Sequence, residues 1–162
     1  YDPRNKTVNL SEPVYNQRNV AAVAVATHEC GHAVQDATGY PLLSARSKMV
    51  PLLRLSSVAL PVLALGGAGI SQWAGYHGTA LLCLVALGFP ALFSVVTLPV
   101  EFNASHRALH WLEQTGLASG DEYRSARKAL FWAAMTYVVA ALGSILQAIY
   151  FAKLLLGRRP QG

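Results

Sequence analysis

Charged side chains are scarce in this chain of 162 residues. Asp, Glu, Lys and Arg together make up 13% of the sequence, whereas an average soluble domain contains about 25%. Hydrophobic residues reach 53%. So few charges among so many apolar residues favour a membrane protein over a soluble one. The length fits a single domain, which we expect to cover residues 1–162.

Cysteine is also scarce, and basic residues do not gather where a nucleic acid would need them. Cys30 and Cys83 are too few for a disulfide framework and are expected to be small buried hydrophobic side chains. The formal net charge is +5, but no segment combines dense Lys and Arg with aromatic residues. A nucleic-acid partner is therefore not expected. The basic residues flank apolar runs, as they do beside membrane-spanning helices.

The beginning of the sequence lacks the apolar segment of a signal peptide. Residues 2–5 are typical of a turn, and residues 6–11 alternate in the manner of a short, half-exposed strand. Such a strand could pair with an extended substrate or simply cap the domain. Because the chain starts with Tyr1 rather than Met, we expect it to be a fragment of a longer protein.

An H-E-x-x-H pattern occupies residues 28–32, inside an apolar run that predicts a helix over residues 19–37. Residues four apart share one face of a helix, so His28 and His32 can offer two imidazole nitrogens to one metal ion. Glu29 lies beside the first imidazole, where a general base for a metal-activated water is needed. The pattern predicts zinc-assisted hydrolysis of a peptide bond.

The competing interpretation is that these three residues fell at this spacing by chance. Three ionisable groups at the end of an apolar run are costly if they are buried without partners, and a metal ion would use all three. Cys30 lies on another face of the helix, which leaves it only a minor candidate as a ligand.

Three apolar runs follow, at about residues 52–73, 79–100 and 129–156. The second has no charged residue and is long enough to cross about 30 Å of hydrocarbon. A Gly-containing turn at residues 74–78 joins the first two runs, which predicts a transmembrane helical hairpin. The third run predicts a C-terminal apolar helix. Aromatic residues near the turn suit a membrane–water interface; they are Trp73, Tyr76 and His77.

Two imidazoles do not complete a catalytic zinc site, which usually has three protein ligands and a water. A hairpin that leaves the membrane surface near Arg54 returns to that surface near Val100. Glu101 is the first charged residue after the return, so topology predicts it as the third ligand. The competing interpretation is an interfacial Glu at the start of a helix over residues 101–112.

The distribution of Lys and Arg predicts the orientation in the membrane. The turn of the hairpin has no Lys or Arg. Basic residues lie before the hairpin, at Arg46, Lys48 and Arg54, and after it, at Arg107, Arg124, Arg127 and Lys128. The positive-inside rule therefore predicts a zinc site on the cytoplasmic side. If residues 129–156 also span, then Lys153, Arg158 and Arg159 lie on the opposite side, against the rule.

His106 and His110 are also four residues apart and could form a second metal pair. No Glu follows His106 and no further ligand is evident. We expect both to be surface residues of an amphipathic helix.

Several segments together resemble the YugP-like neutral zinc metallopeptidases of bacterial membranes. They are residues 28–35, residues 97–105 with Arg107-Ala108, and the shorter pieces Tyr1-Asp2-Pro3-Arg4, Val25-Ala26, Gly39-Tyr40-Pro41, Ala133-Ala134 and Thr136-Tyr137-Val138. The resemblance covers nearly the whole chain. Family members usually have a further N-terminal membrane anchor and a short domain, and both are missing from this sequence. Cys30 replaces the aliphatic residue that is more usual there.

The resemblance implies a mainly α fold, a membrane-associated helical zincin of the gluzincin kind. Its zinc ligands would be His28, His32 and Glu101, and Glu29 would be the general base and acid. Ser105 and Asn103 are in positions to orient the Glu101 carboxylate. A second donor to the oxyanion is usual, and the candidates are Tyr137, His110 and Arg107. The alternative for Tyr137 is a side chain packed at the membrane interface.

The sequence thus predicts a zinc metalloendopeptidase with several spans in a bacterial cell membrane. Its partners would be a peptide or protein substrate and the lipid bilayer. One alternative is a catalytically inactive, metal-binding scaffold or chaperone, which would have no need of Glu29. Another is a polytopic membrane protein such as part of a transporter, in which charged residues are expected at mid-membrane depth. Residues 52–73 and 79–100 contain almost none.

Overall fold

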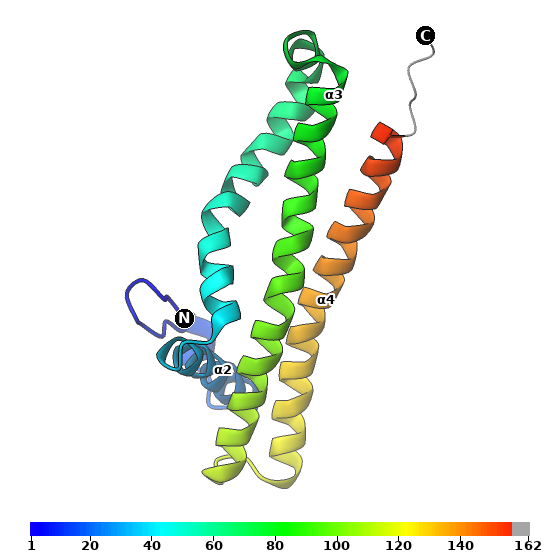
Figure 1. Cartoon of the computed structure of the whole chain (residues 1–162). Coiled ribbons are helices and arrows are strands. Elements are labelled where there is room, and N and C mark those ends of the chain that lie inside the picture. The colour runs from blue at the N-terminus through cyan, green and yellow to red at the C-terminus, as the bar shows by residue number, and fades with distance from the viewer. Residues whose placement is uncertain (157–162) are drawn as a thin grey trace. The chain divides into compact units, whose positions relative to one another are not determined.

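The computed structural model describes residues 1–156 and shows a chain that is helical almost throughout (Figure 1). The helices are α1 (Glu12–Tyr15), α2 (Val20–Ala37), α3 (Pro41–Gln114) and α4 (Gly120–Leu156). The prediction of a mainly α protein is confirmed. Arg158 and Arg159, and the side chains proposed for the membrane interface at residues 73, 76 and 77, lie outside the described part of the chain.

Helix α2 begins and ends where the sequence predicts. The Asn19 side chain accepts a hydrogen bond of 2.8 Å from the backbone nitrogen of Ala22, which caps the first turn. The helix stops before Gly39, whose φ of 64° is easily adopted only by a residue without a Cβ atom. The apolar pattern between these two signals therefore forms one uninterrupted helix.

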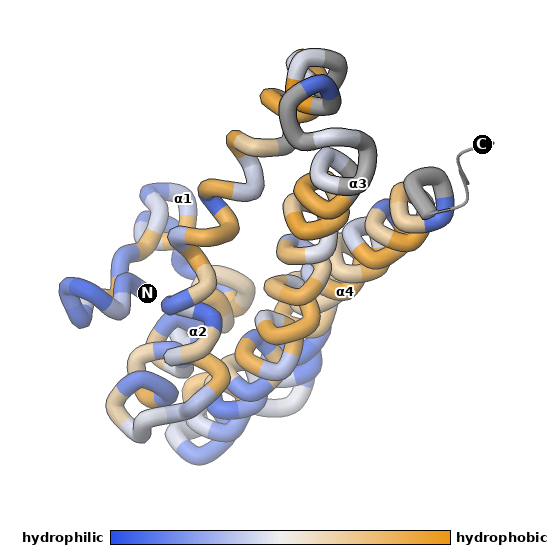
Figure 2. Tube along the Cα trace, turned by 45° about the horizontal axis from the view of Figure 1, so that its top comes forward, coloured by the Kyte–Doolittle hydropathy of each residue, from blue (hydrophilic) through white to orange (hydrophobic). Residues whose placement is uncertain are grey.

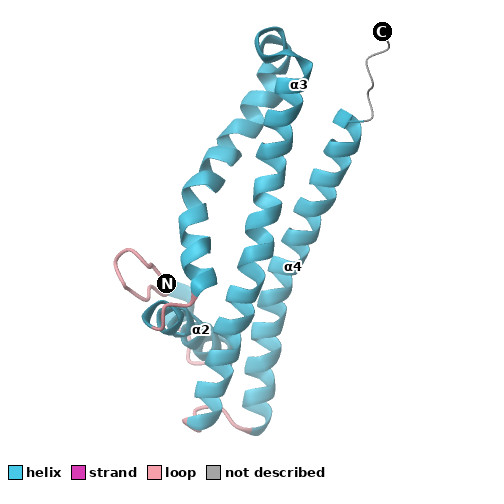
Figure 3. Cartoon of the chain, viewed as in Figure 1, coloured by secondary structure: helices cyan, strands magenta, loops and turns pink. Residues whose placement is uncertain are grey.

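The N-terminal strand predicted at residues 6–11 is wrong. No strand occurs among residues 1–156, and this segment is drawn as loop in Figure 3. The backbone of Asp2 pairs with that of Thr7 in an isolated bridge, and Lys6 takes a left-handed φ of 55° that reverses the chain. An alternating segment needs a partner strand to become a sheet, and the neighbouring elements are helical.

The backbone forms two compact units. The first consists of Tyr1–Ser47 and Val96–Tyr137, and the second of Lys48–Val95 and Val138–Gly162. The first unit contains every residue to which the sequence assigns a catalytic or metal-binding role. The expectation that residues 1–162 act as a single peptidase domain stays a prediction.

Small side chains form the core of the first unit. Ala24 of α2 and Ala108 of α3 are almost completely buried, and small residues let two helices approach closely. A larger apolar set completes this core: Leu112, Ala118, Ala126 and Leu130, with Val20, Leu109 and Tyr123 packed against them. The close approach brings the segment with the two imidazoles against the turn of α3 that carries Glu101.

Apolar residues dominate the described part of the second unit, where orange segments alternate with paler ones in Figure 2. Within α3, Gly75 has non-helical dihedrals (φ 69°, ψ 171°), and the chain reverses there in Figure 1. This break lies in the turn expected at residues 74–78. Among the described residues, Leu81–Gln114 and Gly120–Lys153 are long and apolar enough to cross a membrane. A span at residues 52–73 stays a prediction.

Candidate metal centre

Three donor groups from two helices converge in the first unit. The Nε2 atom of His28 lies 3.1 Å from Oε2 of Glu101, and the Nε2 atom of His32 lies 3.6 Å from the same oxygen. The two imidazole rings are 4.7 Å apart between centroids and nearly perpendicular. All three donor atoms lie within 4.8 Å of one another, so the group could hold a metal ion.

The backbone explains this convergence. His28 and His32 are one turn apart on α2, and Glu101 lies well inside the part of α3 that follows the break at Gly75. The alternative interpretation of Glu101 as the first residue of a new helix is therefore wrong. Its side chain points into the protein and the residue is only 2% exposed.

A buried carboxylate needs compensating charge or hydrogen bonds. One oxygen of Glu101 faces the two imidazoles, and the other, Oε1, lies 3.0 Å from Nη1 of Arg46. Oε1 is nevertheless buried without accepting a hydrogen bond. Oε2 is the oxygen that faces both imidazoles, and two imidazoles with one carboxylate are a donor set that zinc sites use. The residues present therefore fit a zinc ion.

The outer ring nitrogens of both histidines have hydrogen-bond partners. Nδ1 of His32 is 2.9 Å from Oε1 of Gln35, and Nδ1 of His28 is 3.1 Å from Oγ of Ser105. These contacts fix the rings with both Nε2 atoms directed at Glu101, which is the usual arrangement behind metal-binding histidines. From the sequence we expected Ser105 to orient the Glu101 carboxylate. Its hydroxyl group contacts the imidazole of His28 instead.

Asn103 also lies elsewhere than expected. Its side-chain oxygen accepts hydrogen bonds of 2.9 Å from Nε2 of Gln35 and from Nε of Arg107. It therefore supports the residue behind His32 and makes no hydrogen bond to the Glu101 carboxylate.

A cavity of about 160 Å³ opens beside His28 and Glu101, and we call it the metal-side cavity. Glu29 from α2 and Tyr137 from α4 both line it, together with His28 and Glu101. The remaining lining is small or apolar and comes from Val25, Ser105, Leu130, Ala133 and Ala134. The two residues predicted to be catalytic therefore share one cavity with two of the three donors, His28 and Glu101.

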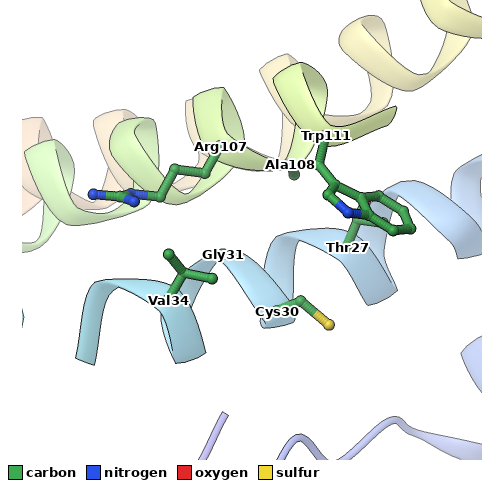
Figure 4. A pocket seen from close by; sticks show the side chains of 7 residues that line it. All are labelled: Thr27, Cys30, Gly31, Val34, Arg107, Ala108 and Trp111. Atoms are coloured by element: carbon green, nitrogen blue, oxygen red, sulfur yellow. The ribbon is translucent and has the colours of Figure 1, made fainter. Parts of the chain in front are cut away.

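A second cavity of about 160 Å³ lies between α2 and α3, and Figure 4 shows its lining. Cys30 and Arg107 line this cavity, and neither lines the metal-side cavity. Cys30 is exposed, so the expectation that it is buried is wrong. His106 and His110 stack in parallel with centroids 6.5 Å apart and belong to no donor group of three among the described residues.

Two residues at the centre were not assigned a role from the sequence. Gln35 is completely buried one turn after His32, and an amide at that place in an apolar helix is the signal that could have pointed to it. Arg46 was expected only as part of a basic membrane flank, but its guanidinium lies against Glu101. Nothing in its sequence neighbourhood indicates that contact.

The N-terminal segment attaches to α2 through Asp36. The Asp36 carboxylate accepts hydrogen bonds from the ammonium group of Lys6 and the hydroxyl of Tyr1. These two bonds lower the pKa of Asp36 below its ordinary value, with Lys6 the larger influence. The hydrogen bond to Asp36 raises the pKa of the Tyr1 phenol to about 12. The backbone nitrogen of Tyr1 also contacts the Glu29 carboxylate.

Comparison with known proteins agrees with this geometry. Residues 1–156 match the model of a family described as "putative neutral zinc metallopeptidase". The chain belongs to this family. A curated relative, the "putative membrane protease YugP" of Bacillus subtilis (strain 168), is 38% identical over 161 residues, which cover 99% of this chain and 70% of that protein. No solved structure matches the chain.

Proposed function

We propose that this protein is a membrane-bound zinc metalloendopeptidase. The observation that carries the proposal is the convergence of His28, His32 and Glu101 beside a cavity that Glu29 and Tyr137 also line. A purely structural cluster would not need a second carboxylate and a phenol facing the same space. The family to which the chain belongs has the same proposed chemistry in its description.

In this proposal His28, His32 and Glu101 hold the metal. A bound zinc ion would activate a water and polarise the carbonyl of the scissile peptide bond. Glu29 accepts a proton from the attacking water and later donates it to the leaving amine. The products are a new carboxyl end and a new amino end of the substrate.

Tyr137 supplies a donor for the developing oxyanion. Tyr137 is a partly exposed residue of α4 that lines the metal-side cavity together with His28 and Glu29 of α2. A phenol can donate a hydrogen bond to negative charge that forms only during the reaction. Of the three candidates that the sequence offered, Tyr137 is the one that lines the metal-side cavity.

The bilayer is proposed as the second partner. The most apolar windows of the two candidate spans are only 22% and 17% buried within the protein, so they lack the cover that interior helices of a soluble domain have. Large exposed apolar surfaces of this kind need another apolar environment. The distribution of Lys and Arg supports a cytoplasmic site in a bacterial cell membrane, with more than one span.

The experiment measures bound zinc and peptide hydrolysis by the protein purified in detergent. We expect His28→Ala, His32→Ala and Glu101→Gln to lose zinc and activity together. His106→Ala and His110→Ala are matched controls, because these exposed imidazoles are not in the donor group, and both should keep zinc. Full zinc occupancy in Glu101→Gln would remove the third ligand from the proposal.

The same assay distinguishes the alternative of an inactive metal-binding scaffold. Such a scaffold would bind one zinc ion per chain in the wild type but cleave none of a broad set of unfolded and membrane-derived peptides. Zinc-dependent cleavage that a chelator abolishes and added zinc restores would exclude it.

A further inference from the structure

A chain of hydrogen bonds runs from the surface of α3 to the outer nitrogen of His32. Arg107 donates through Nε to Oδ1 of Asn103 at 2.9 Å, and Gln35 donates through Nε2 to the same oxygen at 2.9 Å. Gln35 also donates to the backbone oxygen of Val100 at 2.8 Å. Its own oxygen, Oε1, lies 2.9 Å from Nδ1 of His32.

The direction of every bond in this chain follows from its first member. A guanidinium group can only donate, so the Asn103 atom that faces Arg107 must be its oxygen. The Gln35 atom that faces this oxygen must then be the NH₂ group. The remaining atom of the Gln35 amide is an acceptor, and Nδ1 of His32 must carry the proton that it accepts.

A flipped Gln35 amide would break this scheme at two places. Its oxygen would face the Val100 carbonyl and the Asn103 oxygen, and acceptors do not bond to each other. Gln35 is completely buried, so no water at the protein surface compensates such a mismatch. The orientation of the amide is therefore determined by its surroundings.

We propose that Gln35, held by Asn103 and Arg107, is a positioning residue that fixes His32 as the tautomer with its proton on Nδ1. This tautomer leaves the lone pair of Nε2 directed at the position between His32 and Glu101, where a cation would bind. The inference rests on the proposed function for its purpose, but the tautomer itself is a property of the metal-free protein.

His28 provides an internal contrast. Its Nδ1 atom faces the hydroxyl of Ser105, which can donate or accept a hydrogen bond. Ser105 therefore does not impose a tautomer. Nε2 of His28 lies 3.1 Å from the Glu101 carboxylate, which only accepts hydrogen bonds, so this nitrogen carries a proton in the metal-free protein and must lose it when a cation binds. His32, in the proposed tautomer, has no proton on Nε2 to lose.

The first test needs no substitution. Metal-free protein labelled with ¹⁵N-histidine is studied at about pH 8 by two-bond ¹⁵N–¹H correlation, because model imidazoles are neutral there. His32→Asn identifies the His32 signals. We expect a protonated Nδ1 and an unprotonated Nε2 in His32. A proton on Nε2, alone or together with one on Nδ1, overturns the proposal.

The second test measures zinc affinity by competition with a chelator. Gln35→Met keeps the length of the side chain and removes the acceptor, and we expect zinc affinity to fall by about 10- to 100-fold. Arg107→Met acts through Asn103 from a partly exposed position, so its loss should be smaller. Gln114→Met is the matched control, because Gln114 is exposed at the end of α3, and it should bind zinc like the wild type.

The two tests separate this inference from the proposed function. Wild-type affinity in both Gln35→Met and Arg107→Met overturns the inference and leaves the metallopeptidase proposal intact. A wild-type protein that binds no zinc overturns the proposed function, and the tautomer of His32 in the metal-free protein still decides the inference. If Gln35→Met does not fold, the zinc affinity of Arg107→Met and the ¹⁵N–¹H spectrum of the wild-type protein decide whether the inference holds.

Discussion

Gly31 lies against the backbone of Ala104 so closely that no side chain fits between them. A Cβ atom at position 31 would be 2.6 Å from the Ala104 carbonyl oxygen and 3.2 Å from its carbonyl carbon and Cα. Gly31 lies between the two imidazole-bearing residues, and Ala104 follows Glu101 by less than one turn. This contact therefore sets the separation of the helices at the metal centre.

The first prediction concerns Gly31→Ala. Alanine normally favours a helix over glycine by about 1 kcal/mol, but the added methyl group must push α2 and α3 apart, which typically costs about 1–3 kcal/mol. We expect a net loss of stability and weaker zinc binding, measured by thermal unfolding and chelator competition. Gly88→Ala is the control, because a Cβ there meets no atom within 4 Å. A Gly31→Ala protein as stable as wild type would contradict the helix contact.

Glu29→Gln should separate metal binding from chemistry. The substitution keeps the shape of a side chain that lines the metal-side cavity but is not one of the three donors. Loss of a general base typically lowers the rate by about 10²- to 10⁴-fold. We therefore expect normal zinc content and a large fall in kcat. Zinc loss in this variant would show that Glu29 is a ligand and not the base.

Tyr137→Phe removes a single hydroxyl group from the same cavity. If that hydroxyl stabilises the oxyanion, kcat should fall by about 10²- to 10³-fold while zinc affinity and KM change little. Tyr150→Phe is the matched control further along α4, where the side chain is exposed and remote from the donor residues in sequence. Equal kcat values in both variants would leave Tyr137 without a catalytic role.

Arg46→Met tests how the buried carboxylate is compensated without a metal. Arg46 lies 3.0 Å from the Glu101 carboxylate, whose side chain is 3% exposed, and leaving a buried acceptor without its partner costs about 1–3 kcal/mol. A bound cation supplies the missing charge. We expect the metal-free variant to lose stability while the zinc-loaded variant loses less, so thermal unfolding should show a wider gap between the two forms. An unchanged gap would count against this role.

The attachment of the N-terminal segment should depend on pH in a defined direction. The folded pKa of Asp36 lies below its ordinary value of 3.8, so the attachment stabilises the folded protein at pH values above 3.8. It is lost as the pH falls through the lower folded value. A ¹³C carboxyl titration should place the Asp36 midpoint below 3.8. Lys6→Met removes the larger influence and should move the midpoint upward; a midpoint that does not move would contradict the assigned cause.

Much of the candidate metal centre can be predicted from the sequence because it depends on short-range regularity. The 3.6-residue repeat places His28 and His32 on one face of α2 wherever that helix lies. Glu101 was predicted as the third ligand because a transmembrane hairpin returns to the membrane surface from which it left. Both inferences use helix geometry and chain topology, and neither requires knowledge of side-chain packing.

The remaining features depend on how α2 meets α3. Gln35 bonds to the backbone of Val100 across 65 positions of sequence, and no local pattern specifies such a partner. The expected strand at residues 6–11 failed for a related reason. Alternating polar and apolar residues specify only which side chains share one face of a segment. A sheet also needs a second strand beside the first, and here the surrounding chain is helical.

All three donor residues belong to helices, and none comes from a loop. Helical backbone has no free torsions left to adjust, so a cation that arrives would reorganise only side chains. The protein would then fold without metal and bind the ion afterwards, unlike small zinc domains that fold only when metal binds. Chelation should remove the ion and leave the helical circular dichroism unchanged, and reloading should be rapid because no refolding step precedes it.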